Sequence, residues 1–152
     1  MIESEVLVES KNWKKIIKNP SRLISNLLKK FPDEYKFNKK KVQITVLLTN
    51  NKRIKFLNKR FRKKNKSTDI LSFPFFDKKN LKKFIKLKKF YLGDIVISYE
   101  DFIKKNKSNY EISFIKIFIH GFLHLLKFDH ISDNDYLIMN KVENQIFKKI
   151  KV

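Results

Sequence analysis

The sequence predicts a mixed α+β fold in which a small sheet of four strands is flanked by about five helices. Short β-rich segments come between longer segments whose apolar residues have helical spacing. A length of 152 residues, 42% of them hydrophobic, allows one buried core and is too short for two ordinary domains. With two glycines and three prolines there is no flexible linker, so we expect a single domain over residues 1–152.

The first half of the chain predicts two strands and two helices. Residues 3–8 alternate apolar and polar side chains, as a half-buried strand does. Residues 21–31 have helical spacing and follow Pro20, a residue that favours the first turn of a helix. Residues 41–48 are β-rich and are followed by Thr-Asn-Asn, a helix-start signal for the apolar stripe of residues 52–61.

The middle of the chain predicts two more strands around a basic segment. Residues 70–73 form a short apolar run that ends at Pro74, and residues 92–98 form another. Between them, the lysine-rich residues 78–90 fit either a basic amphipathic helix or a solvated insertion. We expect a mobile basic loop with helical tendency.

The last third of the chain predicts two long helices. Residues 110–126 are apolar over most of their length, which is typical of a buried helix. Residues 133–149 carry apolar side chains at helical intervals, and Asp133 is expected to provide an Asx-type cap at their start. The chain is therefore expected to end as a helix packed on the core.

The composition indicates a soluble cytoplasmic protein that is not associated with a membrane. There is no cysteine, so disulfides and thiolate ligands are excluded, and a reducing cytoplasm fits. The N-terminus lacks the basic start and apolar run of a signal peptide. The longest uncharged apolar run, residues 117–126, is about half as long as a membrane span.

Positive charge is concentrated in one part of the chain. The net charge is +21, and residues 51–90 contain 16 lysines and arginines against two acidic residues. Such a density attracts polyanions, and nucleic acid is the abundant polyanion of a cytoplasm. The alternative is that an AT-biased genome enriches lysine on any surface, so part of this charge need not have a partner.

All three histidines fall within residues 120–130, and this grouping predicts a metal site at the end of the apolar helix. His120 and His124 are four residues apart and therefore lie on one face of a helix. His130 follows a plausible chain reversal that can return it to the first two. Three imidazole nitrogens leave a fourth position open for water, as in a catalytic zinc site.

Two alternatives to a catalytic zinc site follow from the same residues. The histidines could be buried polar residues satisfied by hydrogen bonds, although two unligated imidazoles on so apolar a helix would each need a partner. The spacing of the histidines is also that of the metzincin proteases, which carry a glutamate after the first histidine as general base. Gly121 occupies that position here, so peptidase activity is disfavoured.

Three sequence blocks stand in an order that resembles a known family. They are FLNKRFRKKNKSTDILSFPF at 56–75, YLGDIVIS at 91–98 and HGFLHLLKFDH at 120–130. Together they resemble the YbeY family of bacterial single-strand-specific metallo-endoribonucleases of rRNA maturation, whose signature H-G-x-L-H-L-x-G-Y-D-H the third block matches closely. The resemblance covers essentially the whole chain.

The resemblance implies a hydrolase with one Zn²⁺ per chain, held by His120, His124 and His130. It implies maturation of the 3′ end of 16S rRNA and ribosome quality control, with single-stranded RNA, rRNA, and the ribosomal small subunit and its proteins as partners. The family's functional arginine corresponds to Arg62, a catalytic candidate whose planar guanidinium suits a phosphate. Without the resemblance, Arg62 would be one of nine basic residues between 52 and 66.

Two departures from the family pattern and one open assignment remain. Lys127 stands where the signature has glycine, so a turn that favours positive φ must be made with a β-carbon. Ser67 replaces the usual proline, which is expected to loosen the loop before Asp69. Asp129 and Asp69 are both candidates for the general base, but Asp129 could equally orient a metal-bound histidine by accepting its hydrogen bond, so neither is assigned a catalytic role. The alternative function is a non-catalytic ribosome assembly factor with a structural zinc site.

Overall fold

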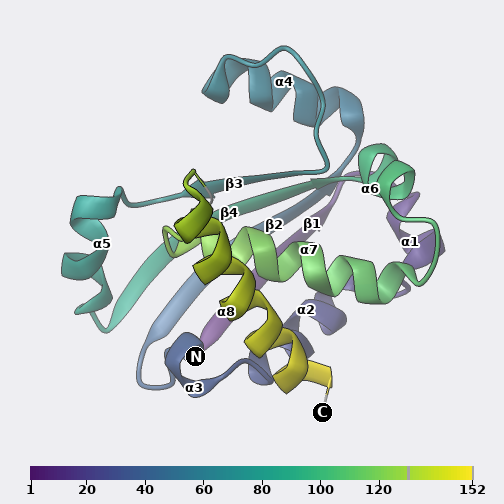
Figure 1. Ribbon diagram of the computed structural model, residues 1–152. Coiled ribbons are helices and arrows are strands. Elements are labelled where there is room, and N and C mark those ends of the chain that lie inside the picture. Colours follow the sequence, from purple (N-terminus) through teal and green to yellow (C-terminus); the bar gives the residue numbers. More distant parts are fainter. Residues whose placement is uncertain (130, 152) are drawn as a thin grey trace.

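A four-stranded mixed sheet forms the centre of the molecule, and the computed structural model describes residues 1–129 and 131–151 (Figure 1). The strands, in chain order, are β1 (Ile2–Val8), β2 (Lys41–Thr49), β3 (Ile70–Pro74) and β4 (Lys89–Ser98). Their order in the sheet is β1-β2-β4-β3. β1, β2 and β4 are parallel, and the edge strand β3 is antiparallel to β4. The predicted α+β class and all four predicted strands are confirmed.

Eight helices are present in the described residues. They are α1 (Trp13–Ile16), α2 (Pro20–Lys29), α3 (Asp33–Lys36), α4 (Asn51–Arg62), α5 (Lys78–Ile85), α6 (Tyr99–Lys105), α7 (Tyr110–Leu125) and α8 (Asp133–Lys151). The three helices that the sequence did not predict, α1, α3 and α6, have only four to seven residues, too few for helical periodicity to show. None of the described helices combines the length and apolar character needed to cross a bilayer.

The main core lies between one face of the sheet and helices α2, α7 and α8. Phe118 and Phe122 of α7 are fully buried there, in the same cluster as Ile44 and Val46 of β2, which are also buried. Helix α4 lies on the opposite face of the sheet from α7 (Figure 1). A smaller cluster of buried side chains, with Ile54 at its centre, holds α4 on β3 and β4. The two faces therefore bring α7 and the end of α4 toward the same edge strand.

Of the two alternatives for residues 78–90, the structure shows the basic amphipathic helix over residues 78–85, so the expected loop was wrong there. Residues 78–85 form helix α5, and the side chain of Asp77 caps it by accepting a hydrogen bond from the backbone N–H of Asn80 at 2.8 Å. Phe84 stacks on Phe76 with ring centroids 3.7 Å apart. The segment is helical because its apolar side chains find a surface to pack on, whereas its lysines remain in solvent.

The predicted N-terminal cap is confirmed for α4 and is wrong for α8. Asn50 caps α4 as expected, since its side-chain oxygen accepts the backbone N–H of Arg53 at 2.9 Å. At α8 the predicted cap was wrong by one residue: the Ser132 hydroxyl, rather than Asp133, accepts the backbone N–H of Asp135 at 3.1 Å. Serine and aspartate cap helices equally well, so the local sequence does not distinguish the two positions.

Candidate active site

His120 and His124 lie one turn apart on α7, and their rings meet edge to face. The two Nε2 atoms are 3.1 Å apart, and both residues are half-buried. The prediction that these two imidazoles share one face of a helix is confirmed. The third predicted ligand, His130, lies outside the described residues.

The spacing of the two Nε2 atoms fits a shared metal ion. Two Zn–N bonds of about 2.0–2.1 Å at a tetrahedral angle place the two nitrogens about 3.3–3.4 Å apart. The observed 3.1 Å differs from that spacing by only a few tenths of an ångström. No group of three His, Asp or Glu side chains surrounds a single point within residues 1–129 and 131–151. The described residues therefore fit two positions of a tetrahedral site.

Gly121 sets how closely α7 approaches the sheet. A β-carbon at this position would lie 2.6 Å from Cδ1 of Ile70 and 3.1 Å from the hydroxyl of Ser72. The Ser72 hydroxyl donates a hydrogen bond of 2.9 Å to the carbonyl oxygen of Gly121. The absence of a side chain between the two histidines thus lets α7 pack directly on β3, and this contact fixes the height of both imidazoles above the edge strand.

Arg62 reaches the same edge strand from the last turn of α4. Its Nη2 donates a hydrogen bond of 2.6 Å to the backbone carbonyl of Ser72, and its guanidinium lies 5.6 Å from the ring centre of Phe73. The carbonyl is available because β3 is the edge of the sheet. Ser72 therefore links the two sides of the site, with its backbone holding Arg62 and its hydroxyl holding α7.

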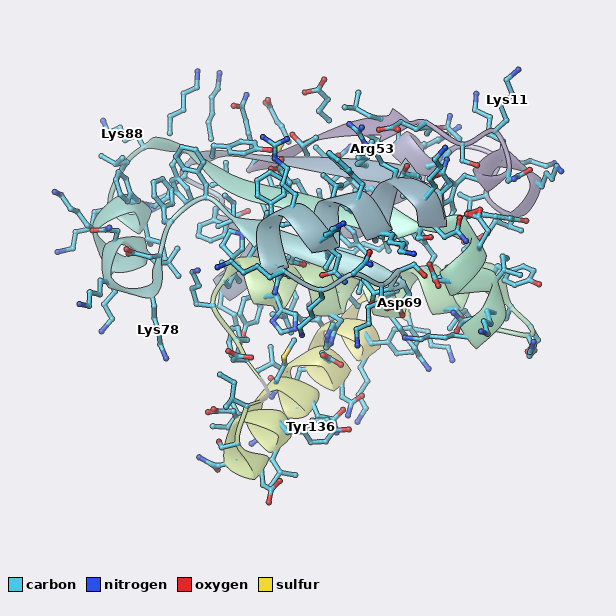
Figure 2. The ribbon with its side chains drawn as sticks, turned by 90° about the horizontal axis from the view of Figure 1, so that it is seen from above. Lys11, Arg53, Asp69, Lys78, Lys88 and Tyr136 are labelled. Carbon is cyan, nitrogen blue, oxygen red and sulfur yellow. The ribbon has the colours of Figure 1, made fainter. Side chains whose placement is uncertain are left out.

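A cleft of about 590 Å³ contains all the predicted site residues that the structure describes. The residues that line it are Arg62, Thr68, Asp69, Ile70, Leu71, Ser72, Pro74, Lys78, His120, His124, Lys127, Phe128 and Asp129. In Figure 2, which looks down on α4, Lys78 lies on the α5 side of this region and Asp69 lies on the α4 side. The cations Arg62, Lys78 and Lys127 line the cleft, so it suits an anionic substrate.

The structure shows the backbone or side-chain contacts of the two residues that depart from the family pattern, Lys127 and Ser67. Lys127 has a φ of 70°, so the glycine position of the signature does require a left-handed backbone, at a cost of about 1 kcal/mol for a residue with a β-carbon. Ser67, which is expected to loosen its loop, makes one contact that bears on this prediction. The Ser67 hydroxyl donates a hydrogen bond of 3.0 Å to the carboxylate of Asp101 on α6, which tethers the loop.

The two candidate bases, Asp69 and Asp129, both line the cleft. The carboxylate of Asp69 lies 3.3 Å from the ammonium group of Lys105. The backbone carbonyl of Asp69 accepts a hydrogen bond from the backbone N–H of Ser98 at 2.9 Å. Asp69 therefore has a clear role in anchoring the loop before β3.

Sequence reasoning missed one residue of the site, Glu143 on α8. Its Oε1 lies 2.7 Å from Nδ1 of His120, on the ring edge opposite the one that faces His124. Glu143 is 23 residues from His120 and outside the three sequence blocks, so no local pattern marked it. Only the packing of α8 across α7, seen in Figure 1, brings the two side chains together.

Comparison with known proteins gives matches over nearly the whole chain. Residues 7–151 match the protein family described as Endoribonuclease YbeY. A protein named Endoribonuclease YbeY from Pelagibacter ubique is 52% identical over 155 residues, which cover 99% of this chain and 97% of the relative. One of the same name from Caldicellulosiruptor bescii is 39% identical, covering 84% of this chain and 82% of the relative.

A solved structure gives independent support for the fold. The solution structure of a protein from Thermotoga maritima superposes with a TM-score of 0.55 at 24% sequence identity, and it covers 99% of this chain and 89% of that protein. At this identity the likeness concerns the fold alone. The arrangement of strands and helices that brings the cleft residues together is therefore found in a second protein.

Proposed function

Because the chain belongs to the Endoribonuclease YbeY family, we propose that it is a zinc-dependent endoribonuclease that hydrolyses phosphodiester bonds of single-stranded RNA. The observation that carries this proposal is a single cleft shared by the paired Nε2 atoms of His120 and His124 and by the guanidinium of Arg62. A phosphodiester in this cleft can meet a metal ion and a planar cation at once.

The proposed metal ligands are His120, His124 and His130, with the fourth position open to solvent. When bound, zinc supplies Lewis-acid chemistry that lowers the pKa of water from about 15.7 toward about 7. The contact between the two described imidazoles supports this assignment, because Nε2 atoms 3.1 Å apart are close enough to share one ion.

Arg62 is proposed to stabilise the charge that develops on the phosphate oxygens. A guanidinium has five N–H donors, and the contact with Ser72 uses only one nitrogen of the fork. The same contact, together with the ring of Phe73, holds the group in place before substrate arrives. A donor that is already oriented stabilises a transition state without a reorganisation cost.

The proposed substrate in the cell is the 3′ end of the small-subunit 16S rRNA, with a further role in ribosome quality control. The support is the family resemblance together with the basic surface of α4 and the loop after it. Residues 52–66 contain nine lysines and arginines and no acid. Such a surface binds phosphates whatever the base sequence, so it suits a large RNA or the ribosomal small subunit as partner.

The proposal is tested by incubating the purified protein with single-stranded RNA, with the same RNA as a duplex, and with casein. Each substrate is tested with zinc, with a chelator, and with zinc restored after the chelator. We expect cleavage of the single-stranded RNA alone, abolished by the chelator and restored by zinc. RNA binding without cleavage by zinc-loaded protein would favour the assembly-factor alternative, and casein hydrolysis would indicate a peptidase.

A further inference from the structure

Helix α8 places a carboxylate behind the first predicted metal ligand. Oε1 of Glu143 lies 2.7 Å from Nδ1 of His120, while Nε2 of the same ring lies 3.1 Å from Nε2 of His124. Nδ1 of His120 therefore faces α8, and Nε2 faces His124 and the candidate metal position. Both side chains of the pair are largely shielded, with 33% of His120 and 26% of Glu143 exposed.

The contact with Glu143 favours one of the two tautomers of a neutral His120. A neutral imidazole has one N–H and one lone pair, whereas an ionised carboxylate can only accept hydrogen bonds. In the neutral ring with its proton on Nδ1, the 2.7 Å contact is a hydrogen bond that the Glu143 carboxylate accepts, and the lone pair is on Nε2. A metal ion needs that lone pair, and a carboxylate on the far nitrogen also makes the imidazole a stronger ligand.

The carboxylate is held in place by the packing of α8. Met139, Val142 and Ile146 of α8 are buried in the core cluster that also contains α7, and they lie close to Glu143 along the helix. Beside the pair is a small cavity of about 150 Å³, lined in part by Tyr136 and Asn140. The α8 backbone therefore does not depend on Glu143 for its position, and the cavity leaves room for a changed side chain.

We propose that Glu143 is a positioning residue of the metal centre, which keeps His120 in the Nδ1–H tautomer and aims its Nε2 at the ion. The inference rests on the proposed function in that it takes His120 to be a metal ligand. Glu143 does not touch the substrate in this assignment. It acts through His120 by fixing the orientation and the tautomer of the ring.

The test compares Glu143→Ala and Glu143→Gln with the wild-type full-length protein. Glu3→Gln serves as a matched control, because it removes the same charge from an exposed position on β1. Zinc affinity is measured by competition with a chromophoric chelator at neutral pH. The tautomer of His120 in the metal-free protein is read from long-range ¹H–¹⁵N correlation spectra, which distinguish Nδ1–H from Nε2–H.

We expect Glu143→Ala to weaken zinc binding by about 10- to 100-fold and to shift His120 away from the Nδ1–H tautomer. Glu143→Gln can still accept the Nδ1–H through its amide oxygen but has lost the charge. It should keep the tautomer and bind zinc with an affinity between those of wild type and Glu143→Ala. Glu3→Gln should behave as wild type in both measurements.

Zinc affinity within twofold of wild type in both Glu143 variants would overturn the proposal, as would an unchanged tautomer in Glu143→Ala. Because Glu143→Gln has nearly the same shape as glutamate, it provides a folded variant even if Glu143→Ala is unstable. Neither measurement uses RNA. A wild-type protein that binds zinc but does not cleave RNA would therefore contradict the proposed function and leave the role of Glu143 supported.

Discussion

The position of the Arg62 side chain bears directly on the chemistry proposed for it. Its guanidinium is held by the backbone of Ser72 and the ring of Phe73 at one wall of the cleft. Nearby lysines can attract a phosphate, but a lysine offers a point charge rather than a planar fork. Replacing Arg62 with lysine therefore tests its role in catalysis separately from its role in RNA binding.

Arg62→Lys should leave RNA affinity nearly unchanged and reduce the cleavage rate by about 100-fold or more, the scale for removing a transition-state donor. The reason is that lysine keeps the charge but cannot hold Ser72 and two phosphate oxygens together. Single-turnover cleavage and RNA binding are measured on the same preparation, and zinc content should not change. Cleavage at the wild-type rate would make Arg62 only a part of the basic surface.

Gly121 is important because the absence of a side chain lets α7 pack closely on β3. Alanine at this position would favour the helix by about 1 kcal/mol, but its β-carbon would lie 2.6 Å from Cδ1 of Ile70, 3.1 Å from the Ser72 hydroxyl and 3.2 Å from Cγ2 of Ile95. We expect the clash to win, so that Gly121→Ala lowers the free energy of unfolding by about 1–3 kcal/mol, as overpacking does. Urea denaturation measures this change.

A second substitution tests the cause of the Gly121 effect. Ile70→Val removes the Cδ1 atom that the new β-carbon would meet. The Gly121→Ala/Ile70→Val double variant should therefore be more stable than the sum of the two single changes indicates. Strict additivity would show that the contact with Cδ1 of Ile70 is not the cause, and it would leave the contacts of the β-carbon with Ser72 and Ile95.

At the scale of elements, α4 and the loop after it form a basic surface next to the cleft. Arg62 ends the helix, and Lys63 caps it with a φ of 58° before the chain continues through Lys64 and Lys66. These three lysines are exposed. Because α5 also carries lysines at the other side of the cleft, the basic surface extends along the site.

Replacing Lys63, Lys64 and Lys66 with glutamine should weaken binding to single-stranded RNA of any sequence. It should also flatten the dependence of log K on log salt by about 0.7 for each phosphate that the variant no longer neutralises. A matched control replaces three lysines near the end of α8, Lys148, Lys149 and Lys151, and it should change the slope less because α8 ends far from α4 (Figure 1). An equal change of slope in both variants would mean that Lys63, Lys64 and Lys66 contribute no more to RNA binding than other surface lysines of this lysine-rich chain.

At the scale of the whole molecule, the candidate metal centre joins elements that are distant in the sequence. Its two described imidazoles lie on α7, its supporting carboxylate on α8, and its neighbouring cation at the end of α4. A ligand that binds only the folded chain stabilises all of these elements together. Metal binding and global stability should therefore be coupled.

The wild-type protein is expected to bind about one zinc ion, and zinc at 100 times its dissociation constant should stabilise the fold by about 2.7 kcal/mol. His124→Ala should lose both the ion and the stabilisation, because one of the two paired nitrogens is gone. Metal analysis and thermal denaturation with and without zinc measure the two effects. Full zinc occupancy in His124→Ala would contradict the ligand assignment.

The sequence by itself was sufficient for the features that depend on near neighbours. Alternation and helical spacing located the four strands and the long helices, and the spacing of four residues predicted that His120 and His124 share one face. Each of these follows from local geometry, because a few successive residues determine where their side chains point.

Only the tertiary structure decided which of these features meet. Arg62 and the histidines come together because α4 and α7 pack on opposite faces and meet at the edge strand β3, through Ser72. Glu143 joins His120 because α8 crosses α7, and the packing of Phe84 on Phe76 decided between the helix and the loop that the sequence allowed at α5. Such contacts join residues far apart in the chain, and burial and close packing select them, so no local pattern encodes them.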